Sequence, residues 1–228
     1  MAYTTIDKPS DYFNTKLYTG TNATQSITGV GFQPDFSWFK TRSDANGHTL
    51  IDSVRGITKR LASHNTQGDI TQADMLTSFD TDGLTLGADS NNYTNWSGKT
   101  WVVWNWLAAN GTASNTNGSI TSTVSANTTA GFSIVTYTGT GSDANVGHSL
   151  SSAPELIITK SRSATGDWKV HTSAIDGSWD VGTLNSTAAF GNSSYTASTN
   201  SIFYVGTGAP TNASGVTYVS YLFHSVKG

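Results

Sequence analysis

The chain has 228 residues, enough for one large domain or two small ones. Only 12% of the residues are charged and the formal net charge is −3, so we expect no basic surface for nucleic acid or anionic lipid. Uncharged polar residues dominate (36 Thr, 30 Ser and 17 Asn), yet aromatic residues reach 11%, which favours a packed β protein over disorder. The absence of cysteine excludes disulfides, thiolate catalysis and cysteine-ligated metals.

Residues 1–15 precede the first repeated pattern and contain Tyr3, Tyr12 and Phe13, so we predict an N-terminal docking arm. No charged region followed by an apolar region, as in a secretory signal, opens the chain. The longest apolar stretches are far shorter than a bilayer span. We therefore expect no cleaved signal and no membrane insertion.

An internal repeat organises the rest of the chain. The tripeptide Tyr-Thr-Gly occurs twice, and each copy is followed by a Pro-acid-apolar strand pattern and later by an aromatic strand pattern, in the same order and at nearly one spacing. The paired blocks are 18–20 and 137–139, 34–43 and 154–163, and 95–106 and 212–223.

Short alternating segments separated by Gly, Asn, Asp and Ser predict an all-β fold made of two tandem antiparallel β-sandwich repeats, lectin-like or jelly-roll in type. We expect repeat 1 at 16–109 and repeat 2 at 132–228. The Asn/Gly/Ser/Thr-rich segment 110–131 between them predicts a linker.

The last strand pattern of each repeat alternates with period two. Val102, Trp104 and Trp106 share one face, and the matching face of the second copy is also large and apolar (Val219, Tyr221, Phe223). We predict that this face is the core, and that the opposite face, with Trp101 and Tyr218, is not.

One stretch is ambiguous. Ile51, Val54, Ile57 and Leu61 fit one side of a short helix, but Gly56 interrupts it. The second copy has an Asp-Gly turn pair at the same place, so we predict hairpins in both copies.

Catalytic motifs are missing: the sequence has no Gly-x-Ser-x-Gly elbow, no P-loop and no dinucleotide-binding turn. The only Glu, Glu155, corresponds to Asp35 in the first copy, which favours a shared strand-edge role over glycosidase chemistry. Asp80 and Asp82 precede a glycine, as in some calcium loops, but an ordinary turn is the better interpretation. The histidines are scattered. We expect no catalytic residues, no metal site and no cofactor.

Both copies keep a Lys/Arg pair, Lys40 with Arg42 and Lys160 with Arg162. These residues fit anion or partner contacts, but preservation between two copies favours a structural role. In that role their aliphatic stems cover the core and their charges pair with Asp52 or Asp167.

Aromatic residues predicted outside the core form an apolar patch, which usually marks an interface. Subunit contact and stacking on sugar rings both fit, and we favour subunit contact. The candidate interface or ligand contacts are Tyr12, Phe13, Trp96, Trp101 and Tyr218.

Taken together, several blocks resemble tandem-repeat virion structural proteins, of head-surface or tail-fibre type, of marine tailed bacteriophages. The blocks are 31–42, 52–56, 78–87, the Trp-rich strand ending at Trp106, and 129–139. The second copy lacks the Asp-Gly-Leu-Thr-Leu motif and most tryptophans. The resemblance implies a lectin-like β-sandwich on a phage particle and supplies no catalytic residues.

We therefore expect a non-enzymatic structural protein on the surface of a bacteriophage particle, as a head decoration or fibre or as a tail-fibre component. Its partners would be itself, as a homo-oligomer, and other virion proteins, with no nucleic acid. The alternative is a carbohydrate-binding receptor-recognition module of a tail fibre, with a host surface glycan as ligand. A polysaccharide-cleaving enzyme is a third, weaker hypothesis.

Overall fold

The structure is a computed structural model that describes residue 6 and residues 8–226. The chain is all-β with several antiparallel sheets, which confirms the prediction of an all-β, antiparallel fold class. None of the helices in the described part is long and apolar enough to cross a membrane.

The described part of the N-terminal half contains a short 3-10 helix and nine strands: η1 (Pro9–Asp11), β1 (Phe13–Thr19), β2 (Gln25–Thr28), β3 (Phe36–Thr41), β4 (Thr49–Asp52), β5 (Lys59–Arg60), β6 (Ile70–Thr71), β7 (Leu76–Asp80), β8 (Gly83–Leu86) and β9 (Thr100–Trp106). The C-terminal half contains β10 (Ala113–Asn115), β11 (Ser122–Asn127), β12 (Phe132–Thr138), β13 (Asn145–Gly147), β14 (Leu156–Ser161), β15 (Lys169–Thr172), β16 (Asp180–Thr183), β17 (Gly191–Asn192), β18 (Ile202–Tyr204), α1 (Ala209–Asn212) and β19 (Thr217–Phe223).

Two larger sheets carry the architecture. The N-terminal half has a four-stranded sheet, β1-β9-β3-β4, and a three-stranded sheet, β2-β8-β7. The C-terminal half has an eight-stranded sheet, β10-β11-β12-β19-β14-β15-β16-β17, and a two-stranded sheet, β13-β18. The order β1-β9-β3-β4 recurs inside the eight-stranded sheet as β12-β19-β14-β15, and the registers correspond: Phe13 pairs with Trp106 as Phe132 pairs with Phe223.

The ambiguous stretch after β4 is a hairpin, as predicted. Leu50 and Leu61 exchange two backbone hydrogen bonds of 2.9 and 3.0 Å. The connecting turn contains Gly56 at φ +99°, a backbone conformation that residues with a Cβ atom rarely adopt. In the second half β15 and β16 pair in the same manner.

Segment 110–131, predicted as a linker, is not a flexible connection over its whole length. It supplies β10 and β11, and β11 pairs with β12. Its Val124 is buried in the core of the C-terminal half. The Thr/Ser-rich composition concealed an alternating pattern, because Ser and Thr are tolerated in strands as well as in loops.

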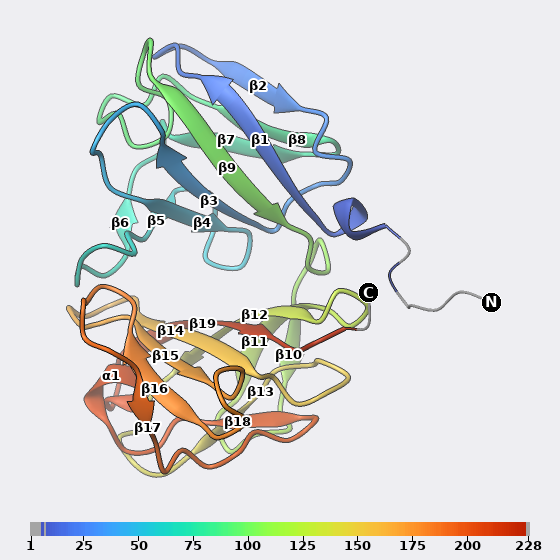
Figure 1. Ribbon diagram of the computed structural model, residues 1–228, viewed down its shortest axis with the longest axis vertical. Helices are drawn as coiled ribbons and strands as arrows, with labels where there is room; N and C mark the ends of the chain where they lie inside the picture. The colour runs from blue at the N-terminus through green and yellow to red at the C-terminus, as the bar shows by residue number, and fades with distance from the viewer. Residues whose placement is uncertain (1–5, 7, 227–228) are drawn as a thin grey trace.

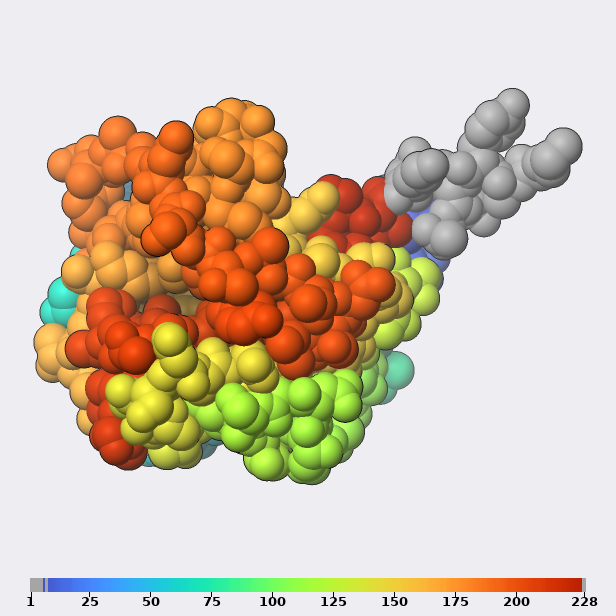
Figure 2. Space-filling view, turned by 90° about the horizontal axis from the view of Figure 1, so that it is seen from below, coloured from blue at the N-terminus to red at the C-terminus, as the bar shows by residue number. Residues whose placement is uncertain are grey.

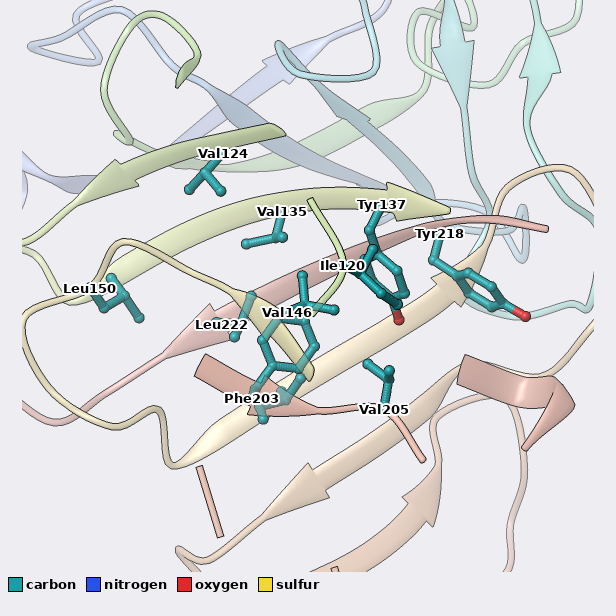
Figure 3. Close-up of a cluster of buried hydrophobic side chains, with 11 residues drawn as sticks. Ile120, Val124, Val135, Tyr137, Val146, Leu150, Phe203, Val205, Tyr218 and Leu222 are labelled. Carbon is teal, nitrogen blue, oxygen red and sulfur yellow. The ribbon is translucent and has the colours of Figure 1, made fainter. Parts of the chain in front are cut away.

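Each half buries a core between its largest sheet and a smaller one. In the N-terminal half, Phe39, Trp101 and Val103 of the four-stranded sheet face Leu84 and Leu86 of the three-stranded sheet. In the C-terminal half, Val135, Tyr218 and Leu222 face Val146 and Phe203 across the corresponding gap (Figure 3).

The core face predicted for the last strand is wrong in the N-terminal half. In the C-terminal half it is correct for Val219 and Tyr221, which are buried in the contact between the halves, but Tyr218 and Leu222 on the opposite face are buried as well. Trp101 and Val103, on the opposite face of β9, lie in the core between the sheets, whereas Val102, Trp104 and Trp106 are only partly buried. Both faces of this strand are apolar because the outer face also packs, in part, against the other half. Alternation alone therefore could not distinguish the inside from the outside.

A third buried cluster joins the halves, where the four-stranded and eight-stranded sheets meet (Figure 1). Phe36 and Leu50 come from the first half, and Phe132, Val219 and Tyr221 from the second. The rings of Phe36 and Tyr221 stack with centroids 4.4 Å apart. The two halves thus meet through a core-like contact and not only through their connecting chain.

A buried polar network crosses the same contact. The Arg55 guanidinium donates to Asp52 at 2.5 Å, and the Tyr221 hydroxyl donates to the same carboxylate at 2.7 Å. Asp69 bridges Arg55 and Arg162, each at 2.9 Å. Burial opposes the charge of Arg55, but Asp52, Tyr221 and Asp69 outweigh burial and raise its pKa above the usual value.

Candidate interaction surfaces

Two of the predicted contact residues lie inside the protein, which corrects the prediction for both. Trp101 and Tyr218 are fully buried, each in the core between the sheets of its own half. The Tyr218 hydroxyl donates to the carbonyl of Ala209 and accepts from the amide of Ala213, both at 2.8 Å. The error follows directly from the wrong choice of core face, so neither ring is available to a ligand or a partner.

The other three predicted residues lie at the surface but do not gather. Phe13 is 39% exposed, and its ring centroid lies 4.8 Å from that of Trp106. Tyr12, partly buried, precedes it. Trp96 lies at the other end of β1, in the turn beside Gly20, under the Lys99 ammonium.

The structure describes only part of the predicted docking arm, residues 1–15. Residues 1–5 and 7 lie outside the described residues. From Phe13 onward the arm is already strand β1, paired with β9 along its whole length.

An aromatic groove lies on the outer side of the four-stranded sheet. The residues that line this aromatic groove are Phe13, Trp38, His48, Trp104 and Trp106. Trp104 lies between Thr15 on β1 and Trp38 on β3, so the three strands present one continuous surface. Leu17, further along β1 on the same side, is 61% exposed.

The indole of Trp38 is held in place by a hydrogen bond from its Nε1 to Nδ1 of His48, 2.8 Å long. Burial, with the nearby charges of Lys40 and His64, lowers the pKa of His48, so at neutral pH the ring is uncharged and can accept this bond. Sequence analysis missed this groove because it assigned Trp104 and Trp106 to the core.

The corresponding surface of the C-terminal half is covered. The cross-strand pair Ile134–Tyr221 corresponds to Thr15–Trp104 in the N-terminal half. The pair Thr136–Val219 corresponds to Leu17–Val102. Ile134, Val219 and Tyr221 are buried by the contact with the N-terminal half, at 0%, 0% and 1% exposure. At these positions the outer face of the C-terminal half is buried, whereas Thr123 and Thr138 at its edge are exposed.

A separate hollow of about 460 Å³ lies in the C-terminal half. Three chain segments, 143–145, 194–196 and 204–206, meet around it, with His171 and Thr211 completing the wall. These segments come together on the face seen from below in Figure 2.

The two matched acids have equivalent structural tasks, as predicted. Asp35 accepts hydrogen bonds from the amides of Ala108 and Asn110, just beyond the end of β9. Glu155 accepts from the amide and hydroxyl of Ser225, just beyond the end of β19. Each carboxylate secures the chain as it leaves the last strand of its half.

Asp80 and Asp82 belong to the β7–β8 hairpin, which confirms the turn interpretation. Asp82 accepts from the amides of Gly31 and Gly29, and these bonds lower its pKa. Asp80 accepts from two hydroxyls, those of Ser78 and Thr85. Within the described residues, no three His, Asp or Glu side chains group as metal ligands.

The repeated lysines are structural, but their partners differ from those predicted. Lys40 donates to the carbonyls of Asp44 and Asn46, closing the loop after β3. Lys160 donates to the carbonyl of Thr66 in the other half, and burial lowers its pKa to about 8. The predicted acids are engaged elsewhere, because Asp52 pairs with Arg55 and Asp167 binds Asn185.

Comparison with known families assigns the chain. A family model described as a domain of unknown function (DUF7483) matches residues 8–228. The chain belongs to the DUF7483 family. No curated protein and no solved structure matches the chain. The DUF7483 match spans both halves and both surfaces described above.

Proposed function

We propose that this protein is a non-enzymatic structural component of a bacteriophage particle, placed on the head surface or on a tail fibre, that assembles through protein–protein contacts. The particle setting rests on the sequence resemblance described above. The assembly role rests on one observation: the aromatic groove and the neighbouring Leu17 are uncovered in the N-terminal half, whereas Ile134, Val219 and Tyr221 on the equivalent face of the C-terminal half are buried.

We further propose that the halves are tandem copies of one β-sandwich unit. The shared order β1-β9-β3-β4 and β12-β19-β14-β15 supports this, as do the matching registers and the equivalent tasks of Asp35 and Glu155. In a duplicated unit, equivalent faces have related packing requirements.

The occupant that fits the open face best is a second copy of this chain. The aromatic groove is continuous with the contact between the halves, because Trp106 lies in the groove and also packs near Phe132 and Phe223. A β-sandwich of the same kind already covers the equivalent surface in the C-terminal half. Repeated copies of one chain usually assemble in this way into closed symmetric oligomers.

Leu17→Lys tests the assembly. It places a charge on the open face at a side chain that is 61% exposed, so the fold should tolerate it. Light scattering coupled to size-exclusion chromatography should show an oligomer for the wild type and a smaller species for Leu17→Lys.

The matched control is Ile175→Lys, also at a 61% exposed side chain but in the loop after β15, away from the groove. We expect it to assemble like the wild type. A monomeric wild type at micromolar concentration, or an unchanged Leu17→Lys oligomer, would contradict the proposed contact. Mass spectrometry of density-purified phage particles tests the particle setting separately.

A further inference from the structure

The hollow in the C-terminal half has the size and shape of a small-molecule site. Its volume of about 460 Å³ lies within the range of about 300–1,000 Å³ typical of ligand pockets. It combines aromatic side chains, Tyr195 and Tyr204, with a carboxylate, an amide and hydroxyls.

One wall is fixed by packing. The Tyr195 ring stacks on His171 with centroids 4.3 Å apart, and its other neighbour is Trp179 at 4.8 Å. The Tyr195 hydroxyl donates to the carbonyl of Tyr204 at 2.7 Å. The wall therefore needs little reorganisation when a ligand binds, and this lowers the cost of binding.

The polar groups of the hollow are free to bind something else. In the described part of the chain, the Asp143 carboxylate and the Tyr204 hydroxyl have no hydrogen-bond partner. Asn145 uses its side-chain oxygen to accept from Ser119, which leaves its Nδ2 donor available among the described residues. Residues that line the hollow thus carry an acceptor and two donors without an internal hydrogen bond among the described residues.

The charge of the hollow excludes an anionic ligand. Among the described residues no Lys or Arg lines it. Burial, with the charge of Lys169, lowers the pKa of His171 to about 4, so this ring is neutral at pH 7. Of the lining residues that the structure describes, Asp143 alone carries a charge at that pH. A phosphate or sulfate would meet repulsion and no cation.

We propose that this hollow binds a neutral saccharide of one or two rings. Asp143 would accept from sugar hydroxyls, Asn145 Nδ2 would donate to one, and the tyrosine rings would contact the apolar C–H faces of the sugar. A quaternary ammonium ligand also suits aromatic rings beside a carboxylate, but it could not use the free amide and hydroxyl donors.

This site belongs to the C-terminal half alone. The position in β4 that corresponds to His171 in β15 is occupied by Ile51. This residue is fully buried in the core of the N-terminal half. The segment 194–196 that closes the hollow follows β17, a strand without a counterpart in the four-stranded sheet. The inference is independent of the assembly through the aromatic groove, which lies in the other half.

The test is a titration of the full chain followed by protein NMR. The probes are glucose, galactose, mannose, N-acetylglucosamine, lactose and maltose, with tetramethylammonium and inorganic phosphate as chemical controls. We expect at least one saccharide to shift amide signals within 143–145, 194–196 and 204–206, and neither control ion to do so.

Asp143→Ala should weaken the binding of that saccharide about tenfold, the effect of losing a charged hydrogen-bond acceptor. The matched control Asp167→Ala removes an exposed carboxylate of the same half outside the hollow and should leave the affinity unchanged. The proposal is overturned if no saccharide binds, if tetramethylammonium or phosphate binds in its place, or if Asp143→Ala binds as tightly as the wild type.

Discussion

Arg55 and Asp52 form an ion pair whose side chains are both fully buried. Replacing Arg55 with Met leaves the Asp52 carboxylate in the interior without its cation. We expect Arg55→Met to lower the free energy of unfolding by about 3–5 kcal/mol, because an unpaired buried charge is more costly than a missing pair. Urea denaturation followed by tryptophan fluorescence measures this loss.

The control for that variant is Lys8→Met, which removes the exposed pair with Asp11 and should change stability little. The double variant Arg55→Met/Asp52→Leu removes both charges and should recover part of the loss. Equal stability of Arg55→Met and the wild type would show that Tyr221 and the backbone suffice to hold the carboxylate.

At the scale of one strand, two of the three tryptophans of β9 have opposite environments. Trp101 is fully buried between the sheets of its half, whereas Trp104 lines the open groove. Trp101→Ala should therefore cost about 3–5 kcal/mol through the cavity it leaves, and Trp104→Ala much less. Denaturation in the Leu17→Lys background compares them without a contribution from assembly.

Equal costs for the two alanine variants would mean that the groove packs as tightly as the core. The comparison is matched because both residues are tryptophans three positions apart on one strand. It also reverses the expectation from sequence, where Trp104 was assigned to the core.

The repeated blocks and the period-two alternation were enough to predict an all-β chain and its hairpins. They could not say which face of a strand is internal, because β9 is apolar on both faces. Trp101 and Tyr218 were misplaced for this reason. Asn105 lies on the true inner face, where it is buried and its side chain accepts a 2.7 Å hydrogen bond from the hydroxyl of Ser37.

The hollow around Asp143 carries no sequence motif. It forms where loops far apart in the chain meet, and Tyr195 and Tyr204 are ordinary residues of such loops in an aromatic-rich sequence. The two acids at strand ends, Asp35 and Glu155, were predictable because their position in the repeated block was itself the signal. A local sequence pattern predicts secondary-structure elements, whereas a site formed by residues far apart in the chain can be located only from the folded structure.

At the scale of the whole molecule, loop 61–69 of the N-terminal half lies against the C-terminal half. Trp168 is fully buried and donates its Nε1 hydrogen bond to the carbonyl of Ala62 at 2.9 Å. The amide of Gly166 donates to the carbonyl of Thr66, and Asp69 forms an ion pair with Arg162. Hydrogen bonds, an ion pair and packed rings thus couple the stability of one half to that of the other.

We expect the wild type to unfold in a single calorimetric transition, because neither half can open without exposing the shared cluster. Ala62→Arg should divide it into two transitions. Ala62 is only 2% exposed and accepts the Trp168 hydrogen bond, so its replacement puts a charge into the contact between the halves and leaves the core of each half intact. Ala45→Arg, in the exposed loop after β3, is the control and should keep a single transition. Two transitions in the wild type would mean that the halves are stable independently, and one transition in Ala62→Arg would mean that their coupling does not pass through this contact.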